Sequence, residues 1–264
     1  MVGSRERERV AGELRRRIRA GDPGPGGRLP SEDELAGLHG ADPAAVRGAL
    51  ALLRAEGLVG DKGDSGTVVL APRRTVRRSS ERHQWEKDRA HAGLRERSAT
   101  GATENDTGSV VDDLVFSARY TRVGADPGLA EALGVPQGTA LLERVYRTRH
   151  RDEDAPFSVA SSYLVLDLVE SNPDLLDESR EPWPGGTQSQ LRTVGVEVDR
   201  VEERITARPP TPDEADGLGL GAGTAVMVLR KTSIDTRGRV VDWSEVILPG
   251  DRSEAVFTTR LERW

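Results

Sequence analysis

Residues 28–70 constrain the fold of this chain more than any other stretch, because they predict two short helices followed by a hairpin. The first helix begins after Ser31, whose hydroxyl can cap the first helical amides, and Glu34 stands three residues later, the spacing of a capping box. Gly40 then suits the left-handed position that ends a helix. This segment is therefore expected to be a helix of about two turns.

The second helix is predicted by Asp42 as its N-cap and Pro43 at its first position, where the missing N–H costs nothing. Its buried stripe is formed by Val46, Leu50 and Leu53. Residues 58–70 then predict two short strands around a glycine-rich tip. Together these elements indicate a winged helix-turn-helix, a module that places one helix in the major groove of DNA with a hairpin beside it.

The order of motifs in this region also resembles the N-terminal module of the GntR family of bacterial transcription regulators. In that family a helix, a glycine-rich loop, Leu-Pro-Ser-Glu, a recognition helix and a Gly-Thr wing follow one another. The corresponding segments here are Val10–Ala20, Gly21–Gly27, Leu29–Glu32, Ala44–Glu56 and Gly66–Thr67. The candidate DNA contacts in this module are Arg28, Ser31, Ala44, Ala45, Arg47, Arg54, Lys62, Gly66 and Thr67.

The front of the recognition helix departs from the family, which usually has Ser-Arg-x-Thr there. This chain has Asp42-Pro43-Ala44-Ala45 instead, and Asp33 in the preceding helix. Two interpretations are open: a binder that reads few bases through Arg47, or a head that has lost tight DNA binding and serves as an interaction module. We favour the first, because Asp42 and Pro43 still start a helix and Arg47 projects from its exposed side.

Composition excludes several classes of protein. The chain has 264 residues and no cysteine, so neither disulfides nor thiolate metal sites are expected, and we predict a cytoplasmic protein. No apolar run is long enough to span a membrane. Residues 1–78 hold 15 Arg and Lys against 11 Asp and Glu, while the rest hold 23 against 33. A basic N-terminal region followed by an acidic remainder is typical of a protein that binds a polyanion through its N-terminal region only.

The expected domains are a DNA-binding domain over residues 1–75, a linker over 76–109 with one helical piece, and a second domain over 110–264. The linker was inferred from its few apolar residues. It contains His83 and His91, but no third ligand of suitable spacing lies nearby, so we expect no metal and no cofactor.

The second domain contains an internal repeat, because Ala130–Leu142 matches Ala215–Met227 at an offset of 85 residues. Each copy predicts a short helix, a turn and two antiparallel strands. Two such units sharing one sheet predict an α+β domain with a pseudo-twofold axis. The glycines between 217 and 223 do not follow G-x-G-x-x-G and are interpreted as turn glycines.

This domain resembles the UTRA ligand-sensing domain of the HutC branch of the GntR family, a fold similar to chorismate lyase. The resemblance depends on Arg147–Arg149, Ala155-Pro156, Ser161–Leu164 and Pro249–Arg252. Family members that bind sugar phosphates hold the anion with an Arg-x-Arg pair, which Arg147 and Arg149 match if the turn is one residue longer. Strand alternation puts both on one side of the sheet, where they could grip a carboxylate or phosphate. Alternatively, both face solvent and pair with Asp152 or Glu153.

The remaining candidate effector contacts are Ser162, Thr187, Gln188, Ser189 and Glu245, with Trp243 as a possible border of the same cleft. Thr187, Gln188 and Ser189 occupy the positions of hydroxyl contacts in the family. The resemblance also has gaps: Ala160 replaces a ligand-binding glutamate, and Leu248 replaces a tyrosine. These departures argue against an amino-sugar effector.

No catalytic constellation is recognisable, since the four histidines are scattered and no serine or acid stands in a nucleophile motif. The rival class is nevertheless an enzyme, because the sensing fold resembles chorismate lyase. An attached DNA-binding head favours a sensor. We therefore expect a homodimeric repressor that binds a double-stranded operator and is released by a small-molecule effector, which Arg147 and Arg149 predict to be anionic.

Overall fold

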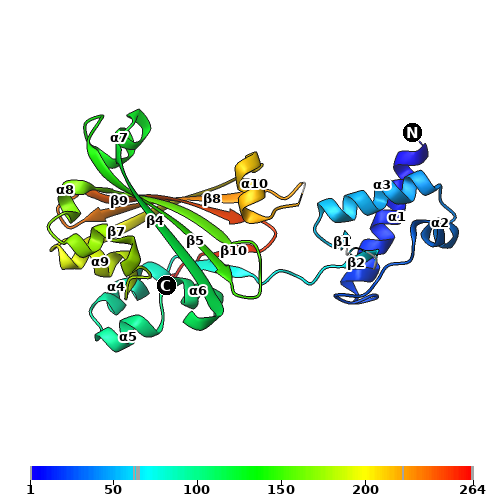
Figure 1. Cartoon of the computed structure of the whole chain (residues 1–264), viewed down its shortest axis with the longest axis horizontal. Coiled ribbons are helices and arrows are strands. Elements are labelled where there is room, and N and C mark those ends of the chain that lie inside the picture. The colour runs from blue at the N-terminus through cyan, green and yellow to red at the C-terminus, as the bar shows by residue number, and fades with distance from the viewer. Residues whose placement is uncertain (1, 62, 64–65, 222, 263–264) are drawn as a thin grey trace. The chain divides into compact units, whose positions relative to one another are not determined.

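The computed structural model describes residues 2–61, 63, 66–221 and 223–262, and it contains two compact units (Figure 1). The smaller unit covers residues 1–74 and 220–224, and the larger covers residues 75–219 and 225–264. In the part of the chain that is described, no helix is long and apolar enough to cross a membrane.

The smaller unit is the predicted winged helix. Its elements are α1 (Val2–Arg19), α2 (Glu32–His39), α3 (Pro43–Ala55), β1 (Val59–Asp61) and β2 (Thr67–Val69). The capping box is confirmed: the Glu34 backbone N–H donates to Ser31 Oγ at 3.3 Å, and the Ser31 backbone N–H donates to Glu34 Oε2 at 2.8 Å. Gly40 adopts the left-handed conformation that ends α2. Asp42 caps α3 and Pro43 is its first residue, as predicted.

The core of this unit is the expected apolar stripe. The fully buried side chains from its three helices include Val10, Leu14, Leu35, Val46, Leu50 and Leu53. Leu35 on α2 is fully buried, but Leu38, three residues later, is 68% exposed. Since α2 is only eight residues long, it presents a narrow face to the core, and a residue three positions on lies off that face.

The larger unit is built on a six-stranded antiparallel sheet in the order β4-β5-β6-β9-β8-β7. Its strands are β4 (Leu114–Gly124), β5 (Ala140–His150), β6 (Ser158–Val165), β7 (Val198–Arg208), β8 (Val226–Asp235) and β9 (Val240–Pro249). Two helices link strands in equivalent places, α7 (Pro127–Leu133) and α10 (Pro212–Leu218). The α+β fold with an internal repeat is thus confirmed.

Each repeat contains one more strand than the sequence predicted. The copies are β4-α7-β5-β6 and β7-α10-β8-β9, and the strand order is symmetric about the β6–β9 pair. The extra strands β4 and β7 are the two edges of the sheet, and polar or charged residues occupy many of their positions. Their half-exposed positions explain why they carry a weak strand signal.

One face of the sheet is covered by helices whose apolar residues share a core with it. The connecting segment holds α8 (Leu166–Val169), η3 (Pro173–Leu176), η4 (Glu178–Arg180) and α9 (Gly186–Thr193). Leu142 and Leu164 on the sheet pack in one cluster with Leu175 and Leu191 from this segment. The opposite face carries α7, which packs near Leu141 and Trp243 (Figure 1).

Residues 76–109, expected to be a linker with one helical piece, are folded onto the larger unit. They form β3 (Val76–Ser79), α4 (Arg82–Ala90), α5 (Leu94–Ala99) and α6 (Ala102–Thr107), followed by η2 (Val111–Asp113). Strand β3 pairs in parallel with β10 (Ser253–Val256) near the other end of the chain.

Residues 76–109 are held in place by a cluster of buried ion pairs. Their low apolar content therefore did not indicate a linker. Arg82 Nη1 lies 2.7 Å from Asp106 Oδ2, and the side chains are only 10% and 4% exposed. Arg78 lies 3.8 Å from the Asp106 carboxylate and 3.6 Å from Glu203 on β7. Burial, together with repulsion from Arg82, lowers the pKa of Arg78 to about 10. Ion pairs thus stabilise this segment in place of apolar contacts, and ion pairs between distant residues leave no periodic pattern in the sequence.

Candidate functional site

The exposed face of α3 is the first candidate site. Ala44, Arg47 and Ala51 are exposed along it, whereas Ala45 is buried at 6% exposure and cannot contact a partner. The side chain of Arg47 is 59% exposed, and its Nη1 lies 3.7 Å from Glu32 Oε2 on α2. An ion pair this long and exposed is weak, so Arg47 is available to donate to another group.

Arg54, a predicted DNA contact, forms hydrogen bonds within the smaller unit. Its Nη2 donates to Asp61 Oδ1 at 2.8 Å and to Thr67 Oγ1 at 3.0 Å, and Thr67 Oγ1 donates to the same Asp61 oxygen at 3.0 Å. These bonds join the end of α3 to both strands of the hairpin. Arg54 and Thr67 therefore fix the angle of the hairpin against α3.

The remaining predicted contacts are Arg28, Ser31, Lys62 and Gly66. Arg28 is exposed, forms a β-bridge with Val68, and lies against Gly66, whose φ of +70° favours glycine. Ser31 is exposed, but its hydroxyl caps α2. Lys62 lies outside the described residues. Of the predicted DNA contacts, Arg47 and Arg28 are thus the exposed cations that the structure describes at this surface.

The acidic residue at the start of α3 is part of the helix itself. The Asp42 carboxylate accepts a hydrogen bond from the Ala44 backbone N–H at 2.7 Å. Its negative charge is therefore a helix cap, and an asparagine would cap equally well. The charge is nevertheless exposed beside the surface that Arg47 occupies on the next turn.

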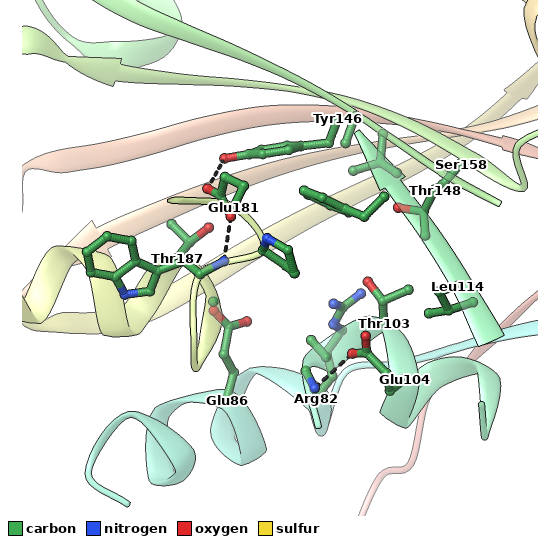
Figure 2. Close-up of a pocket in the computed structure, with 18 of the residues that line it drawn as sticks. Arg82, Glu86, Thr103, Glu104, Leu114, Tyr146, Thr148, Ser158, Glu181 and Thr187 are labelled. Atoms are coloured by element: carbon green, nitrogen blue, oxygen red, sulfur yellow. Dashed lines mark hydrogen bonds between the residues drawn. The ribbon is translucent and has the colours of Figure 1, made fainter. Parts of the chain in front are cut away.

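The second candidate site is a cavity of about 470 Å³ in the larger unit, between the sheet and the helical layer formed by residues 78–104 and 181–190. This size is typical of pockets for small organic ligands. Figure 2 shows Tyr146, Thr148 and Ser158 on the sheet side, with Arg82, Glu86 and Thr103 opposite them. Phe116 and Trp183 add aromatic walls, and Ala160 is a small residue on the sheet side.

The floor of the cavity is a closed ionic network around Asp242, whose side chain is fully buried. Asp242 accepts hydrogen bonds from Ser162 Oγ at 2.6 Å and Ser244 Oγ at 3.1 Å, and lies 3.0 Å from Lys231 Nζ and 3.6 Å from Arg144 Nη2. Burial alone would raise the pKa of Asp242, but the two cations and Ser162 hold it below its ordinary value. Asp242 therefore stays ionised and neutralises both cations in part.

Glu181 forms a second fixed group at the cavity wall. Its Oε1 accepts hydrogen bonds from the hydroxyls of Tyr120 and Tyr146 and from Gln190 Nε2, while Oε2 accepts from the Trp183 backbone N–H at 2.6 Å (Figure 2). Burial raises the pKa of Tyr120 to about 12, so its hydroxyl remains a donor at neutral pH. Four donors thus hold the carboxylate in one orientation.

The structure brings only part of the predicted effector residues to this cavity. Ser162 and Thr187 line it. Gln188 points instead to α4, where its Nε2 donates to the His83 carbonyl at 2.8 Å, and Ser189 accepts from Arg97 at 2.8 Å. These two residues help to dock residues 82–97 on α9.

The expected role of Arg147 and Arg149 as an anion fork is not supported by their positions. Tyr146 and Thr148 line the cavity, so alternation along β5 puts Arg147 and Arg149 on the opposite face. Arg147 is exposed, and Arg149 Nη1 donates to the backbone carbonyls of His150, Arg151 and Glu153, which stabilises the turn after β5.

Glu245 and Trp243 are also on that opposite face, because their neighbour Ser244 lines the cavity. Glu245 Oε2 accepts from Arg230 Nε at 2.7 Å, and Trp243 packs on Tyr163 with ring centroids 5.8 Å apart. These residues were predicted without knowing the register of the sheet. Ser162 lies opposite Arg144 in the ladder and accepts a hydrogen bond from its Nη2 at 2.7 Å, on the face of the sheet that lines the cavity.

The cavity residues that sequence reasoning missed come from segments read as linker or loop. Arg82 and Glu86 lie on α4, and Glu181 precedes the Trp183 loop. Their sequence surroundings are polar and carry no motif. Among the described residues, no group of three or more His, Asp or Glu side chains could hold a metal ion.

Both units of the chain match known protein families. Residues 6–69 match the family described as bacterial regulatory proteins, gntR family, and residues 117–254 match the UTRA domain. An HTH-type transcriptional regulator of Streptomyces coelicolor is 29% identical over 251 residues, which cover 92% of this chain and 88% of that protein.

Two further comparisons agree with this assignment. The HTH-type transcriptional repressor NagR of Bacillus subtilis is 24% identical over 241 residues, covering 91% of this chain and 88% of that protein. The crystal structure of a GntR-family transcriptional regulator has a TM-score of 0.62 and 26% identity, covering 97% of this chain and 98% of its own.

Proposed function

Because this chain belongs to the GntR family of bacterial regulators, in the HutC branch with a UTRA domain, we propose that it is a homodimeric repressor released from its operator by a small molecule. It is a DNA-binding transcription regulator, and the chorismate-lyase-like alternative is not favoured by its relatives. The UTRA domain implies a small-molecule effector. The homodimer, the sign of regulation and a cytoplasmic location belong to the proposal.

One observation carries the proposed coupling between effector and DNA. Arg78, Arg82 and Glu86 line the cavity, and they lie in the segment that directly continues the chain from the winged unit. A ligand in the cavity would contact this segment and shift the equilibrium between its conformations. If one conformation is incompatible with the head spacing that an operator requires, ligand and DNA must weaken each other's binding by the same factor.

Dimerisation is proposed from the geometry of DNA recognition. A single winged helix reads a short half-site, and two heads related by a two-fold axis read a palindromic operator. The exposed cations of the smaller unit favour the phosphate backbone, so operator affinity should fall steeply as salt rises. Sedimentation at micromolar concentration would test the dimer.

The effector is proposed to occupy the cavity between the sheet and α4, with its contacts supplied by both. The expectation of an anionic effector depended on Arg147 and Arg149, which point away from this cavity. We therefore do not carry the anionic charge into the proposal. Ser162 and Thr187 remain candidate hydrogen-bonding partners.

The proposal is tested in two steps with the full chain. Selection from random DNA duplexes should enrich a two-fold motif, and fluorescence anisotropy should then show its release by a metabolite that raises the melting temperature of the protein. If selection enriches no motif, the alternative of an interaction module with a degenerate DNA-binding head replaces the repressor.

A further inference from the structure

Among the described residues, four arginine or lysine and four acidic side chains line the effector cavity. Three of the four cations are already in ion pairs: Arg82 with Asp106 at 2.7 Å, Lys231 with Asp242 at 3.0 Å, and Arg78 with Asp106 and Glu203 at 3.8 and 3.6 Å. The fourth, Arg151, donates to the backbone carbonyl of Asp112 at 2.8 Å. Each acidic partner in these pairs is nearly or fully buried. An anionic ligand would therefore have to compete with an acidic side chain for three of the four cations.

The carboxylates that line the same cavity are not in ion pairs. Within the described residues these are Glu86, Glu104, Asp112 and Glu181, and no arginine or lysine lies within ion-pair distance of them. Glu104 Oε2 accepts from the Gly101 backbone N–H at 2.8 Å, and Glu181 is held by its four donors. These neutral donors fix the two carboxylates without forming an ion pair with them.

Glu86 remains available to a ligand. It lies one turn after Arg82 on α4, a spacing at which the two side chains could pair, but Arg82 is engaged by Asp106 instead. Glu86 Oε1 accepts from the Gln188 backbone N–H at 3.1 Å, and Oε2 has no hydrogen bond among the described residues. Figure 2 shows Glu86 reaching from α4 toward the cavity, below Thr187.

The walls suit the same kind of ligand. Phe116 and Trp183 line the cavity, and the faces of aromatic rings attract organic cations. The small residues Ala160 and Ser158 leave room on the sheet side. Carboxylates that form no ion pair, next to aromatic walls, make a pocket complementary to an ammonium group on a hydrocarbon skeleton.

We propose that the effector is an organic ammonium compound, whose cationic nitrogen is bound by Glu86 and whose hydrocarbon part lies against Phe116 and Trp183. This inference rests on the proposed function, in which the cavity is the effector site. Glu181 and Glu104 contribute negative potential, and the floor network around Asp242 is satisfied without the ligand.

The test compares two probes of similar shape and opposite charge, phenethylammonium and 3-phenylpropionate, by calorimetric titration of the full chain without DNA. Phenethylammonium is expected to bind at least about tenfold more tightly than 3-phenylpropionate. Glu86→Gln should weaken phenethylammonium by about tenfold or more and leave 3-phenylpropionate unchanged or tighter. Glu131→Gln, an exposed substitution on α7, is the matched control and should change neither.

Equal or tighter binding of 3-phenylpropionate would overturn the inference. So would undetectable binding of phenethylammonium at millimolar concentration, or an unchanged affinity in Glu86→Gln. Because these titrations contain no DNA, their failure refutes the ammonium ligand alone, whereas failure to select an operator refutes the proposed function.

Discussion

Asp242→Asn should destabilise the larger unit strongly, because Asp242 is the acceptor on which the cavity floor depends. The side chain is fully buried, and it lies 3.0 Å from Lys231 Nζ and 3.6 Å from Arg144 Nη2. Arg144 is itself 1% exposed, so it cannot recover its charge solvation in water. Breaking a buried pair by removing one partner typically costs about 3–5 kcal/mol.

The asparagine is nearly isosteric, so the loss reports charge and hydrogen bonding rather than packing. Its amide would also present donors where Ser162 and Lys231 now donate. Urea unfolding followed by tryptophan fluorescence is the assay, since all four tryptophans lie beyond residue 84 and report the larger unit. Asp216→Asn on the exposed side of α10 is the control and should stay within about 0.5 kcal/mol of wild type.

The pH dependence of the difference gives a second check. Because the folded protein lowers the pKa of Asp242, its stabilisation is fully present above the unfolded pKa of about 4 and is lost as the pH falls through the folded value. The advantage of wild type over Asp242→Asn should therefore shrink below about pH 4. A deficit under about 1 kcal/mol at neutral pH, or one that grows on acidification, would refute the reasoning.

Three further predictions concern the two binding surfaces. Arg47→Ala should weaken operator binding by about tenfold or more and relax base preference, measured by anisotropy on a panel of single-base operator variants; uniform loss on all of them would contradict base reading. Asp42→Asn should keep the cap of α3, leave thermal stability unchanged and strengthen operator binding about two- to fivefold at low salt, with the gain disappearing at high salt; weaker binding would show that the charge does not oppose DNA. Arg147→Ala should leave the affinity for a cavity ligand within about twofold, because Arg147 lies on the far face of β5; a larger loss by calorimetry would restore it to the effector site.

The winged unit was predictable because its signals are local. Ser31 with Glu34, and Asp42 with Pro43, each specify a helix start within four residues, and the apolar spacing of α3 gives its buried face. The internal repeat likewise revealed both hairpins, because comparing the sequence with itself is enough to detect it.

The cavity was predictable only in part because it depends on register and on pairing between distant segments. A shift of one residue along β5 exchanges Arg147 and Arg149 for Tyr146 and Thr148 at the cavity wall. The docking of residues 76–109 depends on Arg78 and Arg82 meeting Asp106 and Glu203, contacts that no local pattern encodes. Ser162, one of the predicted effector contacts, lines the cavity because it lies on a strand, β6, that faces it.

The central claim is that a ligand in the cavity lowers operator affinity, and Ala160→Phe tests it most directly, since Ala160 lines the cavity and a phenyl group there would fill part of it. The measurement is operator binding by anisotropy, for wild type and variant, titrated with a metabolite that stabilises the wild-type protein. We expect the wild type to release the operator, and the variant to bind the operator within about threefold of wild type but fail to respond to the metabolite. Unchanged operator affinity of the wild type at saturating metabolite, or full release of the variant, would contradict the account.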